Sequence, residues 1–351
     1  MNNHEEDDQL WSIPSNNKSV WYLSSITRHT EQQLSRGHSL LIVFETVRIA
    51  STICSVLGIL SNIALICVIT NTSFRHVSYG LLIVTIAFFD IIRLVSAIFY
   101  YLLFAKIIPI NLITQTIHIA IDRYPIFVVN WCKVLMSIER LLTVRYWETC
   151  THLDWRSKHK RKQRRRFIYS IIFVLVAGLI SQHPNFLLER YESVHINYKR
   201  LMLTVKQNPN FLYAYYRFNE SLFTLISYLI LDTTMPILSA LLINILLLRE
   251  IQKLSLSLQV KVKESIGILF FLTALSVAML PRAFIAFYIH YLADNNNIFF
   301  EKSIMFFYIC LGFEFFNHAI TGYACFLSST LLRCELKNMI CTRYIATHLR
   351  Y

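Results

Sequence analysis

The chain has 351 residues, of which 55% are hydrophobic and 16% are charged, with a mean hydropathy of +0.46 and a net charge of +13. Soluble globular domains carry fewer apolar residues and about one quarter charged residues, so this composition excludes that class. It predicts an integral membrane protein whose surplus positive charge lies outside the hydrocarbon.

The N-terminal segment is polar and carries an acidic cluster at residues 5–8. Residues 1–37 contain no apolar stretch of the kind that a cleavable signal peptide needs, so we expect the first membrane span to act as the targeting signal. The triplet that begins at Asn17 is an acceptor for N-glycosylation. We therefore predict that residues 1–45 form a disordered extracellular segment that is glycosylated at Asn17.

Seven later stretches are apolar over about 20 residues, the length that a helix needs to cross a hydrocarbon core about 30 Å thick. They lack period-2 alternation, which favours helices over a β-barrel. The sequence thus predicts an all-α membrane protein, with a seven-transmembrane helix bundle in residues 46–327 and a short amphipathic eighth helix and cytoplasmic tail in residues 328–351. The predicted spans are 48–70, 80–104, 112–143, 167–187, 222–248, 265–291 and 303–327.

Basic residues concentrate in the alternate connecting segments 71–79, 144–166 and 249–264 and in the tail. Because Lys and Arg stay on the cytoplasmic side during insertion, this pattern predicts a multi-pass plasma-membrane protein with an extracellular N-terminus. A second glycosylation acceptor, Asn219, then lies outside the cell. The basic run within 156–166 fits the anionic inner leaflet, with direct binding of a protein partner as the alternative. It abuts a span, so no nucleic-acid partner is expected.

Cysteines are absent from the predicted outer loops, so no outer disulfide is expected. Cys334 and Cys341 lie in the tail, where they are candidates for palmitoylation, with unmodified thiols as the alternative. No motif for a catalytic metal, an activated nucleophile or a phosphate-binding loop occurs. The chain is therefore predicted not to be an enzyme and to need no cofactor.

Charged residues inside the predicted spans are candidates for function, because a charge at bilayer depth is costly unless it faces the bundle interior and finds a partner. Asp122 and Arg140 are about five helical turns apart, roughly 27 Å, and share one face of the third span. That span thus carries an outer and an inner polar site. The charged residues in spans are Asp90, Arg93, Asp122, Arg123, Lys133, Glu139, Arg140, Asp232, Arg282 and Glu314.

Six short motifs follow one another in the order found in the rhodopsin-like (class A) G-protein-coupled receptors, which residues 45–340 resemble. The last of them contains His where the family usually has Pro, a form seen among invertebrate neuropeptide (FMRFamide-like) receptors. The motifs are Gly58-Ile59-Leu60-Ser61-Asn62, Ile86-Ala87-Phe88-Phe89-Asp90, Glu139-Arg140-Leu141, Pro236, Pro281 and Asn317-His318-Ala319-Ile320-Thr321.

The resemblance implies that Arg140 meets a heterotrimeric G protein on activation and that Glu139 is its resting partner. It also implies an internal polar network of Asn62, Asp90 and Asn317, with a sodium ion at Asp90. The residues to which it assigns a role in coupling or activation are Glu139, Arg140, Asn317 and Pro281.

Several positions depart from the family pattern. Met279 stands where the sixth helix usually has Trp, while Asn244 and Thr321 stand where the fifth and seventh have Tyr. Gln115 replaces the third-helix Cys that normally bonds the second outer loop. These departures indicate a divergent receptor in which the usual Trp-centred activation switch is altered or signalling is lost.

The ligand pocket is predicted to contain Asp122, Asp232 and Arg282. The resemblance places Asp122 where amine receptors and several peptide receptors hold a ligand cation, and two carboxylates in an apolar cleft favour such a ligand. The alternative is that Arg123 and Arg282 pair with these carboxylates structurally.

The outer loop 188–220 is long and rich in Tyr, which favours a peptide ligand over an amine. The sequence thus predicts a neuropeptide receptor that activates a G protein. The alternatives are a biogenic-amine receptor, an orphan receptor that no longer signals and, less favoured, a transporter or an inverted sensory channel.

Overall fold

The computed structural model of the chain describes residues 38–104, 107, 112–149, 153–192, 228–254, 267, 269–277, 279–282, 284–285 and 298–348. Within these ranges almost every residue is helical and none forms a strand. Helices satisfy their own backbone hydrogen bonds, which long apolar segments require in lipid. The predicted all-α class is confirmed for this part of the chain.

All seven predicted spans overlap helical residues. By length and composition, three helical stretches in the described residues are long and apolar enough to cross a membrane, namely Ile42–Asn71, Ser78–Phe99 and Leu229–Gln252. They indicate a membrane protein. In chain order the elements are α2 (His38–Asn71), the 3-10 helix η1 (Ser73–His76), α3 (Ser78–Phe104), α4 (Leu112–Thr149), α5 (Leu153–Glu192), the π-helix η3 (Tyr228–Thr234), α9 (Met235–Gln252), α12 (Ile298–Ser328) and α13 (Thr330–His348). A shorter apolar helix, Leu269–Arg282, precedes α12.

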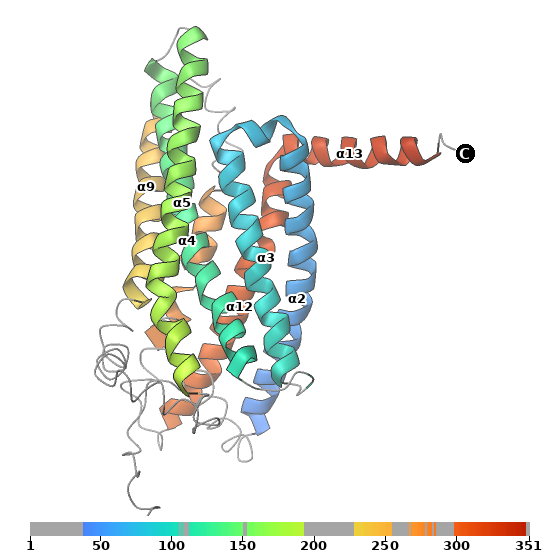
Figure 1. Ribbon diagram of the computed structural model, residues 1–351, viewed down its shortest axis with the longest axis vertical. Coiled ribbons are helices and arrows are strands. Elements are labelled where there is room, and N and C mark those ends of the chain that lie inside the picture. Colours follow the sequence, from blue (N-terminus) through green and yellow to red (C-terminus); the bar gives the residue numbers. More distant parts are fainter. Residues whose placement is uncertain are drawn as a thin grey trace, which may run out of the picture.

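The long helices run side by side as one bundle, and α13 leaves one end of it crosswise (Figure 1). In this bundle α2 packs against α12 and α3, while α4 packs against α3, α5 and α9. Helices α3 and α4 therefore lie centrally, and residues on their inner faces meet side chains from several neighbours.

The two ends of the described chain compare differently with the prediction. Helix α2 begins at His38, within the segment 1–45 that we expected to be extracellular and disordered. Residues 328–351, where a short amphipathic helix was predicted, contain α13, in which Leu332 is buried against the bundle and Arg333 and Lys337 are exposed.

The outward faces of the helices are strongly apolar. Phe173, Tyr169 and Ile180 on α5 are 73%, 70% and 69% exposed, and Leu60 on α2 is 60% exposed. Charged and polar side chains lie buried between the helices instead. This distribution is unfavourable in water and suits a bundle whose outer surface faces lipid.

Helices α2 and α12 approach each other closely at two glycines. A Cβ atom added to Gly58 would lie 2.5 Å from the Cα of Ala319, and one added to Gly322 would lie 2.6 Å from the backbone carbon of Ser61. Small residues at helix contacts allow such approach where lipid removes most of the hydrophobic drive for helices to associate. This contact brings the polar residues of α12 against α2 and α3.

We predict that Gly58→Ala and Gly322→Ala each lower the free energy of unfolding by about 1–3 kcal/mol, because the added methyl group overlaps backbone atoms. The measurement is thermal unfolding of the purified full-length protein. Gly267→Ala is the matched control, since a Cβ there meets no atom within 4 Å. Equal unfolding temperatures for all three variants would show that the two helices are not in close contact.

Candidate functional site

Arg93 lies at the centre of a buried charge cluster. Helix α3 carries its side chain into the bundle, where it has no exposure to solvent. Its guanidinium donates to Asp122 on α4, to Glu314 on α12 with an Nε to Oε1 distance of 3.0 Å, and to Ser96. The guanidinium carbon also lies 4.4 Å from the ring centroid of Phe315. One side chain thus joins three helices.

Arg282 extends the cluster to a fourth element. It donates to the second carboxylate oxygen of Glu314, and its guanidinium lies 5.5 Å from the ring centroid of Phe307. The charges therefore alternate in a row, Asp122, Arg93, Glu314 and Arg282. Because each buried charge touches an opposite one, the cluster offsets much of the desolvation cost of placing ions inside a membrane bundle.

Asp122 and Arg282 form ion pairs with other residues than the sequence predicted. Asp122 was expected either to hold a ligand cation or to pair with Arg123 or Arg282, and the structure pairs it with Arg93 instead. Arg282 pairs with Glu314. The sequence marked all of these residues as interior charges, but their spacing along the chain does not reveal which helices face each other.

Asp232 lies in η3 and is buried. Four residues later, Pro236 has no N–H to donate to the Asp232 carbonyl, which an α-helix would otherwise use. Asn130 on α4 donates to the carbonyl of Asp232 at 2.9 Å in its place, and Trp131 on α4 donates to the neighbouring carbonyl of Leu231 at 3.1 Å. The proline thus fixes η3 onto α4 and places Asp232 at this interface.

A second polar group joins α2, α3 and α12. Nδ1 of His318 lies 2.6 Å from Oδ1 of Asp90, and both side chains are fully buried. Asn62 donates to the carbonyl of His318 at 3.2 Å, and Asn317 contacts the sulfur of Met279 at 3.1 Å. The structure brings Asn62 and Asp90 together through His318, a residue for which the sequence predicted no role in the network.

The predicted polar network contains three buried oxygens of the kind that a sodium ion binds. Oδ2 of Asp90 and the side-chain oxygens of Asn62 and Asn317 are buried without hydrogen-bond partners among the described residues. Hard cations take oxygen ligands of this kind, and buried acceptors are normally satisfied. The bound ion would supply the positive charge that these oxygens lack. In the described ranges, no three His, Cys, Asp or Glu residues group as a metal site.

Glu139 and Arg140 lie on α4 toward the end of the bundle that bears α13. Oε2 of Glu139 and Nε of Arg140 are 3.6 Å apart, an ion pair too long for a hydrogen bond. The Arg140 guanidinium lies over the ring of Tyr79 on α3, 3.5 Å from its centroid. The side chain therefore points into the bundle, as expected for an inner polar site.

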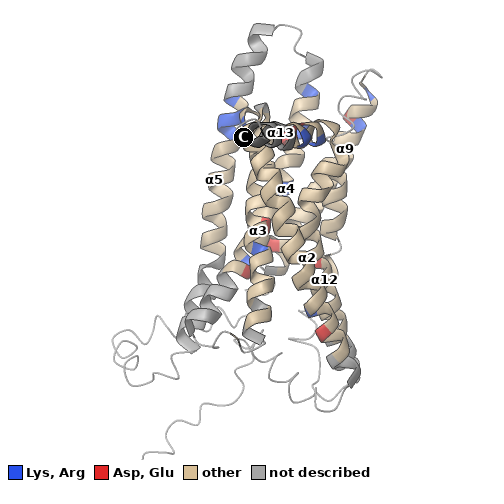
Figure 2. Ribbon diagram, turned by 90° about the vertical axis from the view of Figure 1, so that its right-hand side faces the viewer, with Lys and Arg blue, Asp and Glu red and all other residues tan. Residues whose placement is uncertain are grey.

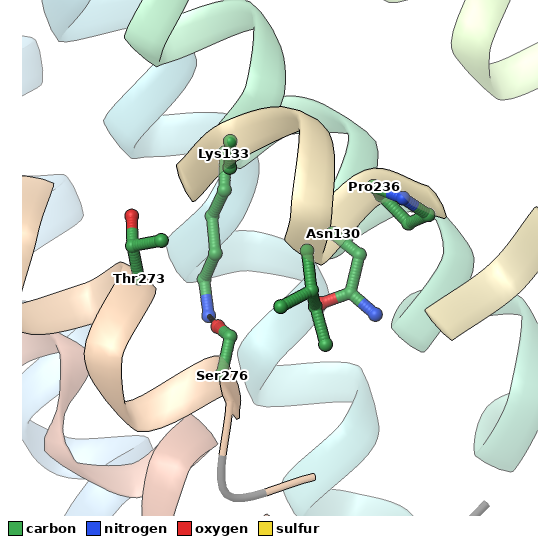
Figure 3. Close-up of a pocket in the computed structure, with 7 residues that line it drawn as sticks. Asn130, Lys133, Pro236, Thr273 and Ser276 are labelled. Carbon is green, nitrogen blue, oxygen red and sulfur yellow. Dashed lines mark hydrogen bonds between the residues drawn. The ribbon is translucent and has the colours of Figure 1, made fainter. Parts of the chain in front are cut away.

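Lys133 is buried midway along α4 and donates to Ser276 at 2.7 Å (Figure 3). Beside it, Asn244 on α9 donates to Thr273 at 2.9 Å. These polar contacts hold the Leu269–Arg282 helix against α4 and α9. The gap between the three elements has no room for a water molecule and is lined by Asn130, Lys133, Pro236, Ile237, Ala240, Thr273 and Ser276.

Met279 and Thr321, two of the residues that depart from the family pattern, each contact residues of the bundle. Met279 packs in an apolar cluster with Ile126 and Ile237, and the Thr321 hydroxyl donates to the Asn317 carbonyl at 3.4 Å. Medium-sized and hydrogen-bonding side chains thus fill the places where the resemblance leads one to expect large aromatic rings.

Basic residues gather at the end of the bundle where α13 lies, on α4, α5, α9 and α13 (Figure 2). Arg164 on α5 donates to the carbonyl of Arg75 in η1 at 3.3 Å. Arg145 on α4 pairs with Glu250 on α9 at 3.1 Å. The separate basic segments of the sequence therefore meet at one end of the molecule.

The remaining candidates are placed as follows. Pro281 precedes Arg282 and is exposed. Cys334 is exposed on α13, so its thiol is accessible, and Cys341 also lies on α13 but its side chain is outside the described part. Both glycosylation acceptors, Asn17 and Asn219, lie outside the described residues, as do residues 193–220 of the predicted outer loop 188–220, whereas residues 188–192 belong to α5.

In comparisons with known proteins, the chain matches no protein-family model and no curated protein.

We predict that Arg93→Leu lowers the free energy of unfolding by about 3–5 kcal/mol, because Asp122 and Glu314 then lose their shared cation. Arg249→Leu, on the exposed face of α9, is the control and should change stability by less than about 0.5 kcal/mol. Thermal and chemical unfolding in detergent measure both. An Arg93 variant as stable as the control would mean that the cluster contributes little to the fold.

Proposed function

We propose that the chain is a divergent rhodopsin-like G-protein-coupled receptor, a seven-helix bundle that transmits binding of an extracellular neuropeptide to a heterotrimeric G protein. One observation carries the proposal: buried polar groups follow one another from Arg282 and Glu314, through Asp90 and His318, to Arg140. Ionisable residues at bilayer depth mark functional pathways in membrane proteins.

The charge distribution supports the orientation. Positive charge collects at the end that bears α13 (Figure 2), which is the cytoplasmic end by the positive-inside rule. The N-terminus is then extracellular, in the plasma membrane, and the basic end lies at the anionic inner leaflet. Cys334, exposed on α13, would face this leaflet and stays a candidate for palmitoylation.

The proposed mechanism concerns the Leu269–Arg282 helix, which contacts Lys133 of α4 through Ser276 and Glu314 of α12 through Arg282. A ligand that changes the charge cluster alters the link between this helix and α12. The Leu269–Arg282 helix also rests on α4 through the Lys133 to Ser276 contact, so its movement would change the packing around Arg140. A shift of this kind needs the ligand to bind one arrangement better than the other.

We predict that Arg140→Ala reduces ligand-dependent G-protein activation by about tenfold to a hundredfold, the loss expected for one charge-assisted contact of roughly 1.5–3 kcal/mol. Cells that express the full-length chain are exposed to a library of synthetic neuropeptides, with dissociation of each G-protein class as the readout. Arg145→Ala removes the same charge further along α4 and is the control.

Two outcomes contradict this function. Silence toward every peptide and every G-protein class, with surface expression confirmed, favours a receptor that no longer signals, and the absent Trp and Tyr residues are the reason to consider it. Equal activation by the Arg140 variant and the wild type removes Arg140 from the coupling site.

We predict that Asn17 and Asn219 carry N-glycans and that Asn17→Gln and Asn219→Gln each remove one glycosidase-sensitive step in the electrophoretic mass. The reason is that only the lumenal and extracellular side meets the glycosylation machinery. Asn71→Gln is the control, since its acceptor triplet lies on the cytoplasmic side. A wild-type protein glycosylated at Asn71 and not at Asn17 would reverse the orientation and favour an inverted sensory channel.

A further inference from the structure

The four members of the charge cluster differ in accessibility. The side chains of Arg93 and Glu314 are 0% and 3% exposed, whereas those of Asp122 and Arg282 are 10% and 13% exposed. Arg93 and Glu314 are therefore closed off inside the bundle, and Asp122 and Arg282 form the two more accessible ends of the row.

The negative side of the cluster is already engaged from within. Arg93 donates to Asp122 and to Glu314, packs over the ring of Phe315 at 4.4 Å and is fully buried. A ligand cation that displaced it from Asp122 would leave a guanidinium inside the bundle with part of its charge unmatched, which is strongly unfavourable. The fit between Arg93 and its carboxylates therefore opposes an ammonium ligand at Asp122.

Arg282 offers the opposite chemistry. A guanidinium carries five N–H donors in a planar fork and can hold a second carboxylate beside the first. The stacking of Arg282 over Phe307 orients this fork. A carboxylate that arrives at Arg282 also competes with Glu314, so it weakens the link between the Leu269–Arg282 helix and α12.

We propose that the ligand binds through a carboxylate on Arg282, and that Arg93 permanently fills the cation site formed by Asp122 and Glu314. This inference rests on the receptor function proposed above and names its ligand class: a peptide or other molecule that reaches the cluster with a carboxylate. The sequence alone favoured a cationic ligand, because it predicted two carboxylates, Asp122 and Asp232, in the pocket. Glu314 is the internal competitor of that carboxylate.

The test uses the full-length protein in lipid nanodiscs and a panel of short synthetic peptides, each made with a free C-terminal carboxylate and with a C-terminal amide, together with biogenic amines. Thermal unfolding and a binding titration are measured without any G protein. The free acids are expected to raise the unfolding temperature, and their amide counterparts and the amines are not. Arg282→Gln is expected to weaken binding of the free acids by about tenfold or more.

Two further variants keep the test decisive. Arg48→Gln removes an arginine of similar exposure, 14%, from α2 and should bind as the wild type does. Glu314→Gln keeps Arg282 but removes its internal competitor, so it is expected to bind the free acids more tightly than the wild type. This gain does not depend on whether Arg282→Gln folds.

Stabilisation by amides or amines alone overturns the proposal, as does undiminished binding to a folded Arg282→Gln protein or the absence of a shift with every carboxylate. The outcome is separable from the receptor function. G-protein activation by amides would support a receptor without an anion site, whereas binding of free acids without activation would support the anion site and contradict signalling.

Discussion

A charge buried in this bundle has to touch an opposite charge on another helix, and this constraint shapes the rest of the structure. Arg93 has no exposure and reaches two carboxylates on two different helices. Removing water from these groups is costly, and only their mutual contact offsets that cost. The positions of α3, α4 and α12 relative to one another are therefore coupled to the geometry of one guanidinium.

Polar contacts of this kind recur at successive depths of the bundle. Lipid tails are as apolar as leucine, so burial of leucine contributes little to the choice between one helix pairing and another. Close approach at Gly58 and Gly322, and hydrogen bonds such as Lys133 to Ser276, distinguish the observed pairing instead. Small residues at close helix contacts and buried polar residues thus specify the packing, and the proposed function assigns the polar ones a further role in sensing a ligand.

The helical class, the presence of helices long and apolar enough to cross a membrane, and the interior position of several charged residues followed from local sequence. Asp90 and Glu139 were recognised as interior residues because a charge within an apolar span is rarely placed toward lipid. The partners did not follow. His318 as the partner of Asp90, and Arg93 in place of Arg123 or Arg282 as the partner of Asp122, depend on which helix faces which. The start of α2 at His38 was also missed, because the charged residues Glu45 and Arg48 interrupt the apolar pattern there, and only the structure shows that they pair with each other.

The sequence by itself determined that the chain is a helical membrane protein with basic connecting segments, because apolar length and the placement of Lys and Arg are properties of short segments. The tertiary structure alone decided how the interior charges are matched. Arg93, Asp122, Glu314 and Arg282 come from four segments separated by many residues. Their pairing is a property of distances in space, and the order of residues along the chain carries no direct record of those distances.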